Sequence, residues 1–176
     1  MSPTTPHRAE VLREVISVAE LRADGVLPMD VPGVQDTFGD ETTLLGALQL
    51  RWHSRLTGRV EQALADEPED LPGAVVRAWQ DAAAEMAGVR AVIDRCLAAP
   101  ADETMAEMLG KATAKERAML AVAAGLASAT DAAAVAAGEL LVQRARTERR
   151  TTTRHSQRTS ASLALVRRIR KAVHAA

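Results

Sequence analysis

Aromatic side chains are nearly missing from this chain. Its 176 residues include one phenylalanine, two tryptophans and no tyrosine. Stretches in which β-branched or aromatic residues alternate with polar ones are also missing, so no strand is indicated. Alanine is abundant instead. It has the highest helix propensity and a side chain small enough for helices to approach closely. We therefore predict an all-α, alanine-rich protein, a compact bundle of about six to eight helices.

Groups that could carry chemistry are equally scarce. Cys96 is the single cysteine, which excludes a disulfide framework and a zinc site built from several thiolates. Its place between Ile93 and Leu97 on an apolar helical face favours a small buried hydrophobe over a nucleophile. The four histidines are scattered, and none belongs to the Glu-x-x-His pairs that hold two metal ions in a bundle. We predict no catalytic residue, no metal and no cofactor.

No long hydrophobic run is present either. A membrane span needs about 18 consecutive apolar residues, and polar or charged residues interrupt every candidate stretch of this chain. Charges also interrupt the apolar positions near the N-terminus, unlike those of a signal peptide. Together with the single cysteine, these features favour a cytoplasmic protein without a membrane span.

Acidic residues are nearly missing from the C-terminal part of the chain. The formal net charge of the whole chain is −1. Residues 144–176 contain ten basic residues and one acidic one, a charge of +9, whereas residues 1–143 carry −10. Such asymmetry is typical of an interaction segment. We predict an acidic helical bundle domain over residues 1–143. A basic C-terminal extension over residues 144–176 follows it, made of an arginine-rich connector and an amphipathic helix.

Several kinds of partner would suit the cations of this extension, which are Arg144, Arg146, Arg149, Arg150, Arg154, Arg158, Arg167, Arg168, Arg170 and Lys171. Such a density of arginine neutralises phosphates, but no aromatic residue is interleaved to stack on bases. Any contact with nucleic acid would therefore be sequence-tolerant. Residues 160–176 place an apolar face opposite a basic one, which favours docking on the acidic residues 1–143, in the same chain or in a second copy. Another protein, nucleic acid and a membrane surface are the alternatives, in that order.

Periodicity and capping signals predict about seven helices before residue 150. They cover residues 8–23, 41–65, 71–87, 89–97, 102–110, 114–128 and 131–149. A loop over 25–40, rich in Pro, Gly and Asp, follows the first helix. Gly88 is expected to end the helix over 71–87. The "TAKE" stretch reads as a capping box, in which Glu116 reaches back to Thr113 at the start of a new helix.

The helix over 41–65 contains polar side chains on its apolar stripe. The candidate ligand-binding residues there are Gln49, Trp52, His53 and Arg59. One interpretation is structural: Arg59 reaches solvent or pairs with an acid such as Asp36 or Glu41, and His53 is a satisfied boundary residue. This interpretation is favoured. The alternative is that the four residues line a pocket for a polar or anionic ligand.

These observations favour a non-catalytic, cytoplasmic interaction or regulatory protein. It would form a homo-oligomer through its alanine-rich helices or its basic extension, or bind another protein, and could sense a small polar or anionic ligand. A sequence-tolerant nucleic-acid-binding protein is the first alternative. An enzyme of unknown class is the second.

Overall fold

Most of the described residues are helical, and the described part of the chain holds no strand. The structure is a computed structural model that describes residues 8–66 and 69–149. Its labelled helices are α1 (Arg8–Arg22), α2 (Val34–Phe38), α3 (Glu41–Asp66), α4 (Leu71–Glu85), α5 (Ala87–Ala98) and α6 (Glu103–Ala123). A further helix covers residues 132–149. The prediction of an all-α, multi-helix bundle is confirmed.

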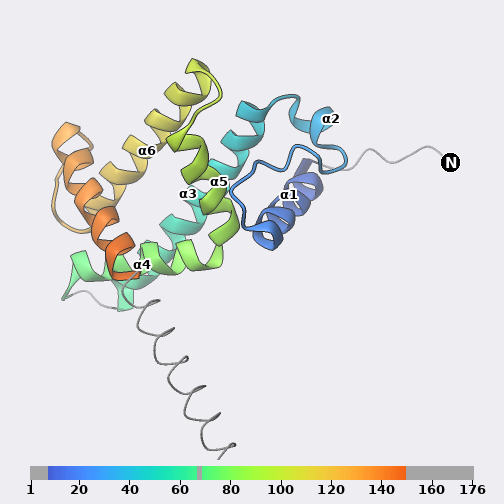
Figure 1. Cartoon of the computed structure of the whole chain (residues 1–176). Coiled ribbons are helices and arrows are strands. Elements are labelled where there is room, and N and C mark those ends of the chain that lie inside the picture. The colour runs from blue at the N-terminus through green and yellow to red at the C-terminus, as the bar shows by residue number, and fades with distance from the viewer. Residues whose placement is uncertain (1–7, 67–68, 150–176) are drawn as a thin grey trace, which may run out of the picture.

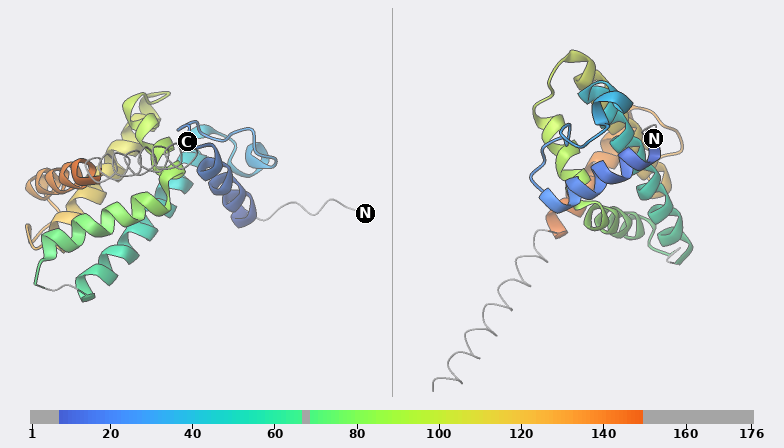
Figure 2. Two further views of the ribbon diagram at one scale, coloured as in Figure 1. Left: turned by 60° about the horizontal axis from the view of Figure 1, so that its bottom comes forward. Right: turned by 90° about the vertical axis from the view of Figure 1, so that its right-hand side faces the viewer.

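The long helix α3 runs through the middle of the bundle (Figure 1) and contacts each of the other labelled helices. Its buried apolar side chains are Leu44, Leu45, Leu48, Trp52, Leu56 and Val60. From Leu45 onward they are spaced by three or four residues and form a single stripe, which the sequence pattern predicted. The helix α4 lies alongside α3 (Figure 2), whereas α1 and the helix over 132–149 lie toward opposite ends of the molecule (Figure 1). α3 is therefore the element through which distant parts of the bundle meet.

Aspartates begin four of the helices. In each case a side-chain oxygen accepts the backbone N–H three residues later. The pairs are Asp40 with Thr43 (2.7 Å), Asp70 with Gly73 (3.0 Å), Asp102 with Met105 (2.8 Å) and Asp131 with Ala134 (2.9 Å). Each cap of this kind stabilises a helix by about 1 kcal/mol.

The break between α4 and α5 falls at Met86, two residues before the Gly88 that the sequence indicated. Gly88 lies inside α5, where a Cβ atom would overlap the carbonyl oxygen of Ala19 in α1. Glycine is therefore required by the close approach of two helices and does not end one. Glu20 of α1 secures this contact by accepting the backbone N–H groups of Gly88 (2.9 Å) and Val89 (3.1 Å).

The predicted break near Thr113 is wrong, because α6 continues from residue 103 to residue 123. Glu116 does not reach back to cap a helix. Its side chain is buried and accepts hydrogen bonds from two tryptophans in other helices. A capping box and an ordinary helical turn share the same residue types at this spacing, so only tertiary contacts separate them. The predicted loop over 25–40 is also interrupted, since it contains the short helix α2.

Small residues hold α6 against the helix over 132–149, as the sequence predicted. A Cβ atom at Gly138 would overlap the carbonyl oxygen of Arg117. A second small cluster contains the buried Ala118, Ala121 and Ala134. The helix continues through residue 144, where the division into two parts was drawn, and Ala145 is fully buried. That division stays a prediction, and the predicted helix over 160–176 lies outside the described residues.

Within residues 8–66 and 69–149, no helix is long and apolar enough to span a membrane.

Candidate anion-binding pocket

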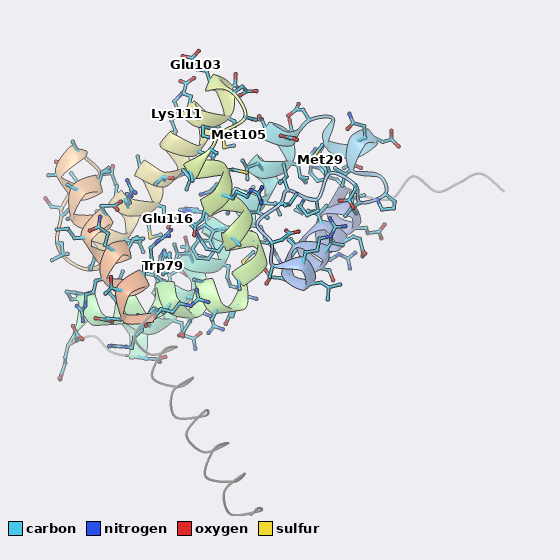
Figure 3. The ribbon with its side chains drawn as sticks, viewed as in Figure 1. Met29, Trp79, Glu103, Met105, Lys111 and Glu116 are labelled. Carbon is cyan, nitrogen blue, oxygen red and sulfur yellow. The ribbon has the colours of Figure 1, made fainter. Side chains whose placement is uncertain are left out.

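One of the predicted site residues, Trp52, lies in the core and not in a pocket. Its indole N–H donates to Glu116 Oε2 at 2.8 Å, and the indole N–H of Trp79 donates to Oε1 of the same carboxylate at 3.2 Å. The two rings meet edge to face, with centroids 6.0 Å apart. The carboxylate of Glu116 is only 6% exposed. Trp79 and Glu116 lie in the middle of the bundle (Figure 3).

Two arginines complete this buried arrangement. The Arg90 guanidinium lies 4.9 Å from the Trp52 ring centroid, and its Nη1 lies 3.6 Å from Glu116. Asp94 accepts hydrogen bonds from Arg90 (2.6 Å) and from Arg146 (2.7 Å), a residue of the helix over 132–149. Burial raises the pKa of Asp94, but the hydrogen bonds and positive charges of Arg90 and Arg146 outweigh it, so the pKa lies below its ordinary value.

We call this group the tryptophan centre: Trp52, Trp79, Arg90, Asp94, Glu116 and Arg146. It contains two guanidinium groups and two carboxylates, so its formal charge is balanced. It connects α3, α4, α5, α6 and the helix over 132–149 through direct contacts. A balanced, hydrogen-bonded group of this kind is a structural element, since no charge in it is left for a ligand.

The other predicted ligand-binding residues are not brought together. Gln49 is buried, and its Oε1 finds no hydrogen-bond partner within the described ranges. His53 is half-buried, and its carbonyl oxygen accepts a hydrogen bond from the Thr57 hydroxyl. Arg59 lines a pocket that does not include Gln49, Trp52 or His53. Its ion-pair partner is Glu85 of α4, not the Asp36 or Glu41 suggested by the sequence.

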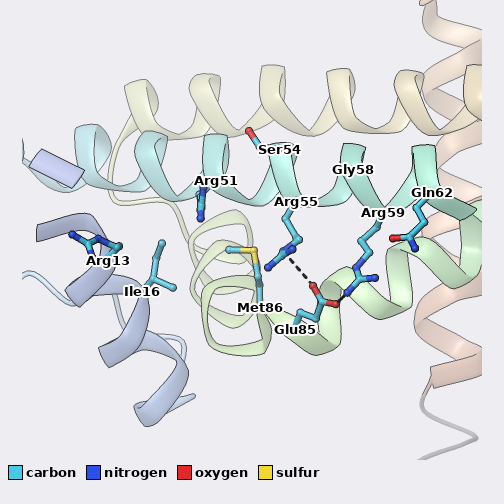
Figure 4. A pocket seen from close by; sticks show the side chains of 10 residues that line it. All are labelled: Arg13, Ile16, Arg51, Ser54, Arg55, Gly58, Arg59, Gln62, Glu85 and Met86. Carbon is cyan, nitrogen blue, oxygen red and sulfur yellow. Dashed lines mark ion pairs between the residues drawn. The ribbon is translucent and has the colours of Figure 1, made fainter. Parts of the chain in front are cut away.

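The pocket containing Arg59 lies between α1, α3 and the junction of α4 with α5 (Figure 4) and has a volume of about 630 Å³. Its lining residues are Arg13, Ile16, Arg51, Ser54, Arg55, Gly58, Arg59, Gln62, Glu85 and Met86. Four of them are arginines and one is acidic, so the lining carries a formal charge of +3. We call it the arginine pocket.

A single carboxylate serves two of these arginines. Glu85 pairs with Arg55 Nε at 3.2 Å through one oxygen and with Arg59 through the other (Figure 4). Arg51 has no ion pair or hydrogen bond to any described residue, and Arg13 at the rim makes only a 4.0 Å contact with Glu10 besides a bond to a backbone oxygen. The positive charge of the pocket is therefore only partly neutralised.

A sequence signal for this pocket exists but was missed. Arg51, Arg55 and Arg59 are spaced by four residues and share one face of α3. Like charges at this spacing destabilise a helix by a few tenths of a kcal/mol, so such a row indicates a negative partner elsewhere. That the partner is Glu85, and that Arg13 joins from α1, depends on helix packing.

A second pocket, of about 530 Å³, lies at the adjoining N-terminal ends of α3 and α6 and is acidic. Its carboxylates are Asp40, Glu41 and Asp102, of which Asp40 and Asp102 already accept backbone N–H groups as helix caps. Across the described ranges, no group of three or more His, Cys, Asp or Glu side chains could hold a metal ion.

Three of the ten cations of the basic extension lie within the described residues. Arg146 belongs to the tryptophan centre, and Arg144 donates to Glu148 at 2.7 Å. Arg149 also has an interaction within the structure. The other seven cations lie outside the described residues; they are Arg150, Arg154, Arg158, Arg167, Arg168, Arg170 and Lys171. The first part of the predicted binding run is thus engaged in internal contacts.

No protein-family model matches this chain, and neither a curated protein nor a solved structure gives a significant match. The arginine pocket is therefore the feature from which a function can be inferred.

Proposed function

We propose that this chain is a non-catalytic regulatory protein that senses a small anion in the arginine pocket. The observation that carries the proposal is the imbalance of charge in that pocket, where four arginines surround one carboxylate. The volume of about 630 Å³ lies within the range of small-molecule sites.

Arginine suits this role because its planar guanidinium binds carboxylate or phosphate through two parallel hydrogen bonds. Arg51 is the first contact for a ligand, since no residue of the described part competes for it. Ile16 and the buried Met86 give the pocket an apolar side against which an organic anion can pack.

The lining also supports binding in preference to catalysis. Ser54 carries its only hydroxyl group, and that group donates to the carbonyl oxygen of Leu50 at 3.0 Å. Glu85, its only carboxylate, is held between two arginines and is a poor general base. A ligand in the pocket would contact charged and apolar side chains but no activated nucleophile.

The cytoplasmic location and the self-association expected from the sequence belong to the same proposal. Large exposed side chains include Leu126 (51%), in the connection that follows α6, and Leu140 (66%), in the helix over 132–149. They are available to a second copy or to another protein. Nucleic-acid binding is the weaker alternative, since Arg144 and Arg146 are engaged internally.

Filling the pocket tests the proposal. Gly58 lines the pocket and has open space where a Cβ would stand, as does Gly46 on the same helix outside the pocket. Gly58→Leu should abolish the rise in melting temperature caused by pyrophosphate or citrate, whereas Gly46→Leu should leave it intact. An equal rise in both variants, or no rise in the unmodified chain with either anion, would contradict the proposal.

A further inference from the structure

The carboxylate of Glu85 occupies the position that a ligand anion would take. It bridges Arg55 and Arg59 from the opposite wall of the arginine pocket (Figure 4), and its side chain is 29% exposed. We infer that Glu85 is a built-in counter-anion, and that a ligand binds by replacing its carboxylate on these two arginines. This inference rests on the proposed function and adds how the site is regulated and which anions it selects.

The bridge to Arg59 is incomplete, which makes it replaceable. Arg59 Nε is buried and has no hydrogen-bond partner among residues 8–66 and 69–149. One carboxylate, shared between two guanidinium groups, cannot satisfy all of their donors. A phosphate or a dicarboxylate brings more acceptor oxygens and more negative charge to the same place.

Glu85 also stands where a side chain can move with little disturbance. It is the last residue of α4, and the next residue, Met86, has a non-helical backbone with φ −122° and ψ 45°. The first N–H groups of α5 are held by Glu20 of α1. α1 also supplies Ile16 to the pocket, so the pocket adjoins the contact between α1 and α5.

The covalent attachment of the Glu85 carboxylate to α4 determines which class of ligand can replace it. A side-chain carboxylate fixed to α4 has a high effective concentration at Arg55 and Arg59, so a free monocarboxylate cannot displace it. An anion with two or more charges can, because Arg51 and Arg13 bind its additional charge. The site therefore selects polyanions such as phosphate esters, diphosphates or dicarboxylates over monoanions.

The test compares acetate and pyrophosphate by calorimetric titration of the full chain and of Glu85→Gln. The unmodified chain should bind pyrophosphate and show no acetate binding. Glu85→Gln should bind pyrophosphate about tenfold more tightly, and acetate binding should become measurable. The control is Asp81→Asn, which removes an exposed carboxylate one turn earlier on α4, outside the pocket. It should change either affinity less than twofold.

Comparing the two ligands separates displacement from a general change of charge. Loss of a competitor strengthens the binding of both ligands by similar factors, whereas a long-range effect scales with ligand charge and would strengthen the binding of pyrophosphate much more than that of acetate. Glu85→Ala should repeat the result if Glu85→Gln is poorly folded. Pyrophosphate binding that Gly58→Leu abolishes but Glu85→Gln leaves unchanged would overturn the inference alone. Absence of binding to every variant would overturn the proposed function as well.

Discussion

The tryptophan centre and the arginine pocket both contain arginines and carboxylates, but they differ in the balance of positive and negative charge. In the centre, Arg90 and Arg146 face two carboxylates, and two indole N–H groups supply further hydrogen bonds. The pocket is lined by four arginines and one carboxylate, Glu85, which pairs with two of them. In the centre Arg90 and Glu116 are buried and must be paired, whereas the more exposed arginines of the pocket can retain an excess of positive charge that a ligand neutralises. The number of counter-charges, more than the presence of arginine, separates a structural group from a binding site.

The largest effect is expected from removing a carboxylate of the tryptophan centre. Glu116→Ala leaves two buried indole N–H groups without their acceptor and removes one of the two carboxylates that pair with the buried Arg90, which should lower the free energy of unfolding by about 3–5 kcal/mol. Glu107, on the same helix, is exposed and pairs with Lys111. Glu107→Ala should therefore lower it by only about 0.3–0.5 kcal/mol. Urea unfolding measures both, and equal losses would mean that the centre does not stabilise the bundle.

Two glycines give the next largest contrast. Gly88→Ala forces a methyl group against the backbone of α1, which should destabilise the fold by about 1–3 kcal/mol. Gly58→Ala meets open space in the pocket and replaces a helical glycine, so it should stabilise by up to about 1 kcal/mol. Thermal melting of the two variants should shift in opposite directions. A shift in the same direction would contradict the packing described at one of these positions.

Acid should weaken the tryptophan centre through Asp94. The pKa of Asp94 is lowered in the folded chain, so its stabilising contribution is present above the unfolded pKa and is lost as pH falls through the folded one. Stability should therefore decline below about pH 4. Asp94→Asn should reduce that decline, and Asp81→Asn should not. Denaturant midpoints measured from pH 7 to pH 2 give the comparison.

The smallest effect on stability is expected at Arg51 in the arginine pocket. Arg51→Ala removes an exposed cation with no partner in the described part of the chain and relieves its repulsion with Arg55, so the free energy of unfolding should change by less than about 0.5 kcal/mol. The same variant should lose at least about tenfold in pyrophosphate affinity, because one charge-assisted contact disappears. A clear loss of stability with unchanged affinity would show that Arg51 has a structural role.

Local rules recovered most of the fold from the sequence. The stripe on α3 follows from residue spacing and was predicted, and the four helices that begin with an aspartate cap start within one residue of the predicted positions. Gly88 and Glu116 were misinterpreted, because their roles depend on residues that lie 68 and 64 positions away in the chain. A glycine that ends a helix and one that admits a neighbouring helix look alike in a single sequence.

The candidate site was predicted only at Arg59. Gln49, Trp52 and His53 share its helix, but packing turns Trp52 toward Glu116 in the core. The row formed by Arg51, Arg55 and Arg59 was visible in the sequence, whereas its partner Glu85 comes from another helix. Sequence spacing can reveal a charged face, but only the fold shows whether opposite charges from other helices neutralise that face.

The contrast between pocket and centre can be tested in one titration. The chain has only two tryptophans, so its indole N–H signals report on the tryptophan centre alone. When pyrophosphate is added to the ¹⁵N-labelled full chain, the Nε–H signals of Arg51, Arg55 and Arg59 should shift in a saturable manner. The two indole signals should stay in place. Shifts of the indole signals without any change at these arginines would contradict the account.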